Sequence, residues 1–199
     1  MFICNFKIIL KSNYSIKDHF NKYIDFTEIE IDDILSHFTL AEFDKKEILL
    51  REGNVCNHKF FIIEGLVRSY HLDHKGNKKI NQFAIENWWI TNIESFVNES
   101  PSLTSIETIE PTKVLKIDKN TLEDLYIKHP KLERYFRIIT EHMLVAIQRR
   151  YEVFLQLKSK DRYLNFIKNL PEFSQRVPQY MIASYLEITP EYLSELRKA

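Results

Sequence analysis

The chain has 199 residues, of which 44% are hydrophobic and 28% are charged, and its 28 basic and 28 acidic side chains give a formal net charge of zero. This composition is typical of a globular protein with a sizeable core, and it excludes a uniformly basic coat for nucleic acid. The charge is uneven, because residues 131–199 carry 12 Lys and Arg against 8 Asp and Glu, which leaves 16 against 20 for residues 1–130. The C-terminal third is therefore the better candidate for a polyanionic partner.

The first ten residues, Met1–Leu10, are apolar apart from Asn5 and Lys7. They lack the small-residue cleavage site of a signal peptide and are too short to span a membrane, so we interpret them as an N-terminal strand or an extension. The two cysteines, Cys4 and Cys56, are far apart and form no Cys-x-x-Cys pair. We therefore expect a cytoplasmic protein without a metal site.

Helical and extended patterns alternate along the chain. Residues Ser15–Phe38 have apolar side chains at three- and four-residue steps, which predicts helix. From Thr39 to Asp118 the pattern changes to short β-type runs separated by turns. The expected strands are Thr39–Phe43, Glu47–Arg51, Lys59–Ile63, Leu66–Leu72, Lys78–Ile85, Ser105–Ile109 and Lys113–Ile117. Such regularly spaced strands predict a jelly-roll barrel or a sandwich, and the segment Asn87–Leu103, which interrupts them, could cap a pocket.

From Lys119 the pattern is helical to the end of the chain. A short helix over Thr121–Lys128 precedes Pro130, and a long helix over Leu132–Leu157 follows it. The apolar stripe of the long helix is wide enough to pack on the barrel along one side and on a twin helix along the other, although a monomeric core helix is the alternative. We expect a homodimer whose interface includes Leu132, Phe136, Ile139, Met143, Ala146 and Arg150.

The last residues, Val177–Ala199, follow a further helix over Arg162–Leu170 and contain two short amphipathic segments. Their shared apolar positions are Ile182, Leu186, Ile188, Leu193 and Leu196, with Ala183 where two helices would cross closely. Thr189 is a good N-cap, and Pro190 suits the first helical position, where a missing N–H costs nothing. Two short helices and a tight turn are typical of a helix-turn-helix, although an ordinary helical hairpin is the alternative.

With its barrel, long helix and helix-turn-helix in this order, the chain resembles the Crp–Fnr family of bacterial transcription regulators. The residues that carry the resemblance are Leu50–Gly53, Phe60–Arg68, Arg176–Gln179 and Ile188–Ser194. The resemblance implies an α+β protein with an N-terminal jelly-roll β-barrel of cyclic-nucleotide-binding type, a long dimerisation helix and a C-terminal helix-turn-helix domain in its short, wingless form. The implied domains are residues 1–130 for the sensor barrel, 131–158 for the linker helix and 159–199 for the DNA-binding domain.

The phosphate-binding cassette of the resembled family has a Gly-Glu pair and a later arginine. Here Thr91-Asn92 stands at the position of the pair, and no Arg or Lys occurs between Lys79 and Lys113. Since burying a phosphate without a cation is costly, we expect no cyclic nucleotide bound in the usual way, no cofactor and an unknown effector. A pocket for such an effector would be lined by Trp89, Asn92, Ile93, Glu94, Ser95, Thr104 and Ser105.

The leading hypothesis is a homodimeric transcription regulator that binds double-stranded DNA, with a possible small-molecule effector and no membrane association. The residues expected to contact DNA are Arg176, Gln179, Tyr180, Thr189, Pro190, Glu191, Ser194, Glu195, Arg197 and Lys198. The rival is a ligand-binding sensor whose helix-turn-helix no longer binds DNA. It is favoured by Glu187, where the turn suits a glycine with positive φ, and by Glu195, where the resembled family commonly carries arginine.

Catalysis is not expected. His58, His71 and His74 lie outside the spacing of a metal triad, so turn histidines on the surface explain them better. No serine lies in a Gly-x-Ser-x-Gly context, and the three glycines do not form a phosphate-binding loop.

Overall fold

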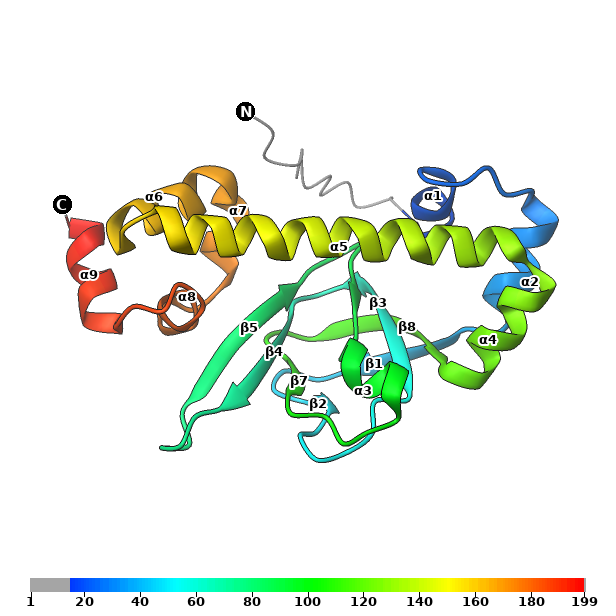
Figure 1. The fold of residues 1–199 in the computed structure, drawn as a ribbon, viewed down its shortest axis with the longest axis horizontal. Helices are drawn as coiled ribbons and strands as arrows, with labels where there is room; N and C mark the ends of the chain where they lie inside the picture. The colour runs from blue at the N-terminus through cyan, green and yellow to red at the C-terminus, as the bar shows by residue number, and fades with distance from the viewer. Residues whose placement is uncertain (1–14, 199) are drawn as a thin grey trace.

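The computed structural model describes residues 15–198, in which a long helix runs beside a β-barrel and leads to a group of short helices (Figure 1). The expected strand or extension at Met1–Leu10 lies outside the described residues. The elements are α1 (Ile16–Asn21), α2 (Glu28–Ser36), β1 (Thr39–Phe43), β2 (Ile48–Leu50), β3 (His58–Glu64), β4 (Val67–Leu72), β5 (Lys78–Ala84), β6 (Trp89–Ile90), α3 (Ile93–Asn98), β7 (Ser105–Thr108), β8 (Thr112–Asp118), α4 (Lys119–Lys128), α5 (Pro130–Gln156), α6 (Ser159–Asn169), α7 (Pro171–Arg176), α8 (Gln179–Tyr185) and α9 (Pro190–Lys198).

The first helical segment is divided in two, which corrects the prediction of continuous helix over Ser15–Phe38. Helix α1 ends at Asn21, and α2 begins after Thr27. The Thr27 hydroxyl accepts from the Glu30 N–H, and the Glu30 carboxylate accepts from the Thr27 N–H. This capping box satisfies the free amides of a new helix start, so the chain restarts there although no glycine or proline breaks the pattern.

Within residues 15–198, eight strands form two four-stranded antiparallel sheets, with the orders β1-β8-β3-β6 and β2-β7-β4-β5. The seven predicted strands are confirmed. Strand β6 was not predicted, because its two residues are too few to show alternation. The α+β fold class and its jelly-roll barrel are therefore confirmed.

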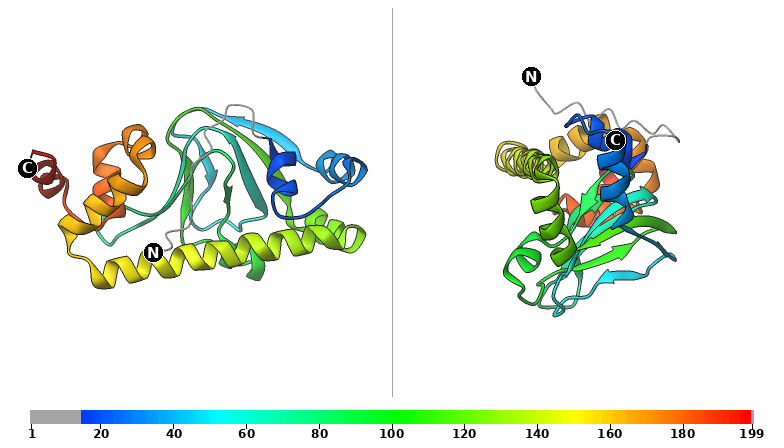
Figure 2. Two further views of the ribbon diagram at one scale, coloured as in Figure 1. Left: turned by 90° about the horizontal axis from the view of Figure 1, so that it is seen from above. Right: turned by 90° about the vertical axis from the view of Figure 1, so that its right-hand side faces the viewer.

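Two apolar clusters hold the elements together. The first fills the barrel and extends to α1, α2, α4 and the start of α5, where Leu132 and Tyr135 are fully buried. The second lies between the outer face of β4 and β5 and the C-terminal helices; its members include Leu66, Tyr70, Ile80, Phe83, Phe166, Phe173, Met181, Ile182 and Leu193. The C-terminal helices therefore pack on the barrel. They also contact the second half of α5, where Arg150 lies over the Tyr185 ring and Phe154 lies under the Arg162 guanidinium, and Figure 2 shows these helices beside the far end of α5.

No helix within residues 15–198 has both the length and the apolar character needed to cross a bilayer.

Candidate nucleic-acid interface

Helices α8 and α9 are joined by a tight turn centred on Glu187. The backbone of Glu187 has φ +55°, so the chain keeps the left-handed turn that suits a glycine and does not adopt a different one. The Ile188 N–H donates to the Ala183 carbonyl at 3.0 Å, which closes the C-terminal end of α8. Ala183 itself is fully buried, as a close crossing of two helices requires.

The start of α9 is set by its first two side chains. Thr189 Oγ1 accepts a hydrogen bond from the Tyr192 N–H at 3.1 Å, and Pro190 occupies the first helical position. The Thr189 hydroxyl is therefore already used as an N-cap, although the residue remains exposed. Leu193 is buried against α8 and fixes which side of α9 faces solvent.

The solvent-facing side of α9 carries both signs of charge. Its exposed polar side chains are Glu191, Ser194, Glu195, Arg197 and Lys198. On α8, Tyr180 is exposed and Gln179 is half-buried. All of these side chains are at least partly accessible, as contact with DNA requires, and that contact stays a prediction.

Arg176 is engaged elsewhere, which corrects its expected role as a free phosphate contact. Its Nη1 and Nη2 each donate to a different carboxylate oxygen of Glu86 at 2.9 Å, and Nη2 also donates to Glu110. Burial on its own raises the pKa of Glu86, but the hydrogen bonds from Arg176 and from the Gly65 N–H lower it overall. The same pairing raises the pKa of Arg176, so the three charges form a clamp between α7 and the barrel.

The expected dimer interface on α5 is also corrected in part. Leu132 and Phe136 are buried in the core of their own chain, so they are not available to a twin helix. Ile139 packs partly against that core and is half-buried, and its place in the interface stays a prediction. Arg150 donates to the carbonyls of Asn81 and Tyr185 and lies 4.1 Å from the Tyr185 ring centroid. Met143 is half-buried and Ala146 is exposed.

A different set of α5 residues forms an exposed apolar stripe in the second half of the helix. Its members are Leu144, Ile147, Tyr151 and Leu155, each between 54% and 69% exposed. They recur at three- and four-residue steps, so they share one side of the helix. In the sequence, these residues belong to the same wide apolar pattern that predicted Leu132 and Phe136 at the interface.

Several residues of the expected effector pocket around α3 are packed or hydrogen-bonded within the chain, and the pocket itself stays a prediction. The Trp89 ring packs on Phe61 and Phe136, and its Nε1 donates to the Tyr135 hydroxyl at 2.8 Å. Asn92 caps α3 and donates to Thr104 Oγ1 at 2.8 Å.

The serines of the expected pocket are satisfied inside the chain in the same way. Ser95 accepts from the Cys56 N–H and donates to the Ser100 carbonyl, while Ser105 accepts from the Glu52 N–H. Of the remaining members, Ile93 and Glu94 are exposed on α3. The polar groups of this segment therefore stabilise the fold and leave few free partners for a ligand.

Two lysines that are distant from α3 in the sequence lie close to it in the structure. The order of residues in the sequence did not indicate this proximity. Lys119 Nζ donates to the Val97 carbonyl and pairs with Glu99 at 2.8 Å. Lys59 Nζ lies 4.4 Å from the centroid of the Phe96 ring, and burial lowers its pKa to about 8. Lys119 is thus neutralised, and Lys59 faces an aromatic ring.

With the geometry described, comparison with known proteins shows what the chain is similar to. Residues 40–129 match the model of the cyclic nucleotide-binding domain. The chain is 23% identical to an anaerobic regulatory protein of Pasteurella multocida, over 76% of this chain and 59% of that protein. These matches agree with the resemblance to Crp–Fnr regulators.

Solved structures show the same fold. The structure of FixK2 from Bradyrhizobium japonicum has a TM-score of 0.71 at 18% identity, covering 81% of this chain and 83% of that one. The catabolite activator protein of Thermus thermophilus has a TM-score of 0.58 at 14% identity, covering 88% and 84%.

The chain spans less than two thirds of the length of the first curated relatives that it matches. The expectation that it is not an enzyme agrees with the regulatory protein that it matches. Among residues 15–198, no three His, Cys, Asp or Glu side chains are grouped so that they could hold a metal ion.

Proposed function

We propose that this chain is a homodimeric transcription regulator that binds double-stranded DNA through α8 and α9. The observation that carries the proposal is the helix pair itself, with its left-handed turn at Glu187, its buried Leu193 and its exposed polar side on α9. In such a unit the second helix enters the major groove and the first lies across the phosphate backbone. The similarity to an anaerobic regulatory protein and the resemblance to Crp–Fnr regulators support the same assignment.

Specific roles follow from the exposed side of α9. Ser194 and Glu191 can approach base edges, and a glutamate can accept from a cytosine amino group. Arg197 and Lys198 at the end of the helix supply phosphate contacts, which make affinity fall as salt rises. Arg176 is left out of this set, since its guanidinium is clamped to Glu86 and Glu110.

The second half of α5 supports self-association. Four large apolar side chains on one side of a solvent-exposed helix are poorly placed for a monomer, and a twin helix would bury them. We expect Ile147→Asp to convert the dimer into a monomer in analytical ultracentrifugation. Gln156→Asp, at an exposed position outside the stripe, is the matched control and should leave the dimer intact.

The sensor barrel, on this proposal, holds no cyclic nucleotide in the usual way. Lys119 near α3 is already paired with Glu99, and the polar side chains of that segment bond to one another. Titration with cyclic AMP should therefore give no saturable heat of binding at micromolar concentrations.

A second candidate function is a sensor protein without DNA binding, because Glu191 and Glu195 place two carboxylates on the exposed side of α9. Selection from random duplexes with the purified full chain separates the two. An enriched inverted repeat with half-sites about one helical turn apart supports the regulator. Absence of any enrichment at low salt supports the sensor.

Replacing Glu195 by arginine tests whether α9 faces DNA at all. Glu195→Arg should strengthen binding to a random duplex about tenfold and steepen its salt dependence by about one unit of log–log slope per subunit. The control is Glu52→Arg, an equal change of charge at an exposed barrel loop. Equal effects of the two substitutions would argue that α9 does not lie in the groove.

A further inference from the structure

A cavity of about 330 Å³ lies between the outer face of the second sheet and helix α8, outside the barrel interior. Its barrel wall comes from β4, β5, β7 and the β1–β2 turn, and its helical wall is formed by Pro178, Tyr180 and Met181. The volume lies at the lower end of the range for small-molecule sites. It is therefore a ligand-sized space shared by the barrel and the helix-turn-helix.

The charge around this cavity is strongly positive. Lys45, Lys46, Arg68 and Lys78 line it, and the carboxylate of Glu107 is its acidic lining group. The lining residues together thus carry three more positive than negative charges. A concave site with low-dielectric walls concentrates such a field and attracts anions.

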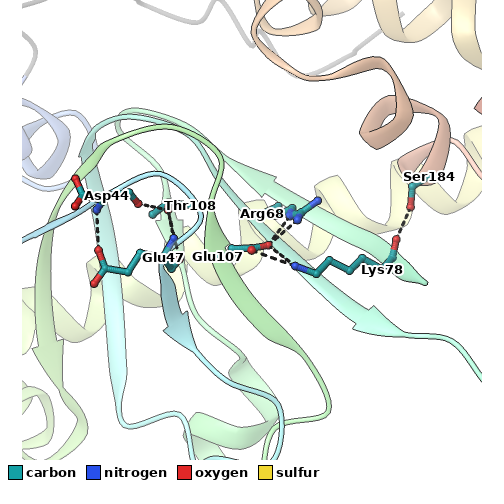
Figure 3. A network of polar contacts seen from close by, with 7 residues as sticks. All are labelled: Asp44, Glu47, Arg68, Lys78, Glu107, Thr108 and Ser184. Atoms are coloured by element: carbon teal, nitrogen blue, oxygen red, sulfur yellow. Dashed lines mark hydrogen bonds and ion pairs between the residues drawn. The ribbon is translucent and has the colours of Figure 1, made fainter. Parts of the chain in front are cut away.

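Arg68 is the most buried cation of the cavity wall. Its side chain is only 7% exposed, and its Nε and Nη2 donate to Glu107 Oε2 at 3.0 and 2.6 Å. No hydrogen bond from its Nη1 is seen within residues 15–198, and Figure 3 shows one guanidinium nitrogen pointing away from Glu107. Since Arg68 lines the cavity, this nitrogen is a donor that a bound anion would use.

The two lysines of the β1–β2 turn are held over the cavity by backbone contacts. The Lys46 N–H donates to the Thr108 carbonyl at 3.1 Å, while Thr108 Oγ1 donates to the Asp44 carbonyl and accepts from the Glu47 N–H (Figure 3). Neither Lys45 nor Lys46 forms an ion pair with a residue of the described chain. Both charges remain available to a ligand.

Strand β5 connects the cavity to the helix-turn-helix by hydrogen bonds. Lys78 Nζ pairs with Glu107 at 2.9 Å, and the Lys78 carbonyl accepts from the Ser184 hydroxyl of α8 at 3.1 Å. Ser184 Oγ also accepts from the Ile80 N–H at 3.1 Å. A ligand that contacts Lys78 and the start of α8 therefore bridges the two parts of the chain.

We propose that this cavity binds a small organic anion that carries phosphate or carboxylate groups. Its acidic head lies between Arg68 and the two turn lysines, and its apolar part packs on Ile109 and Met181. The inference rests on the proposed function in one respect, because the anion acts as an effector only if α8 and α9 bind DNA. Binding of the anion itself does not depend on DNA.

Calorimetric titration of the full chain with sodium pyrophosphate and with sodium citrate, at constant ionic strength without DNA, tests the site. We expect saturable binding of at least one probe, weakened about tenfold or more in the double variant Lys45→Gln/Lys46→Gln. The double variant Lys75→Gln/Lys79→Gln removes two exposed lysines that do not line the cavity, and it should bind like the wild type. Circular dichroism establishes that both variants are folded.

The results separate the site from the proposed function. No saturable binding of either probe by the wild-type chain, or equal weakening in both variants, would overturn the site. Lower DNA affinity of Lys45→Gln/Lys46→Gln without any change in anion binding would mean that these lysines contact DNA phosphates, which would also overturn it. Saturable, lysine-dependent anion binding by a chain that enriches no duplex would support the site and refute the regulator.

Discussion

Arg176 anchors the C-terminal helices to the barrel, so removing it should measure how strongly the two parts are held together. In Arg176→Met the carboxylates of Glu86 and Glu110 lose their shared cation and face each other without compensation. Hydrogen bonds to charged groups contribute about 1.5–3 kcal/mol each, and loss of one partner from a buried pair costs about 3–5 kcal/mol. Since the three side chains are between 21% and 33% exposed, we expect a smaller loss of about 2–3 kcal/mol.

A double-mutant cycle isolates the pair from its surroundings. Glu86→Gln keeps an oxygen that can accept from the Gly65 N–H, so the cycle with Arg176→Met reports mainly on the charge pair. We expect a coupling energy of about 1–2 kcal/mol in urea unfolding at pH 7. The lowered pKa of Glu86 means that the coupling is fully present above the unfolded pKa of a glutamate, and it is lost as pH falls through the folded pKa. A coupling below about 0.3 kcal/mol at pH 7 would refute the clamp.

Three further substitutions test local features of the fold. Gly65→Ala should lower the free energy of unfolding by about 2–4 kcal/mol, because its Cβ would lie 2.5 Å from Thr112 Oγ1 at a φ of +110°; an unchanged thermal midpoint would contradict the close approach. Glu187→Gly should raise stability by up to about 1 kcal/mol, since glycine tolerates the observed φ of +55°, and a loss in urea unfolding would argue against that turn. Lys59→Met should stabilise the chain by about 1–2 kcal/mol at pH 7, because burial beside Phe96 disfavours the charged amine. With a folded pKa of about 8 against 10.5 in the unfolded chain, wild-type stability should rise between these pH values while that of the methionine variant stays flat.

The strands were predictable because alternation is a local property, and the left-handed turn at Glu187 followed from the helix pair around it. The break between α1 and α2 also had a local signal, since Thr27 and Glu30 have the spacing of a capping box. Apolar periodicity continues through both helices and by itself predicts one helix, whereas the capping box marks the break between them.

The misplaced site residues had no comparable local signal. An arginine suits a phosphate contact and an ion pair equally well, so the residue type at position 176 does not distinguish the two roles. Its partners Glu86 and Glu110 are 90 and 66 positions away. On α5 one wide apolar stripe serves two purposes, because the helix extends past the barrel. Leu132 lies where the barrel covers the helix, and Ile147 lies where that cover ends. Which residue meets which surface depends on how far the barrel reaches, and that is a property of the tertiary fold.

The unbroken course of α5 has a mechanical consequence. Its 27 residues contain no glycine and no proline after the first position, so the helix is a stiff rod of about 40 Å. A tilt of about 10° at the barrel end would move the far end by about 7 Å, which is twice the 3.4 Å spacing of nucleotides along one DNA strand. In the proposed dimer, such a tilt would move each recognition helix by about two base steps, so a rigid α5 would amplify small motions at its barrel end.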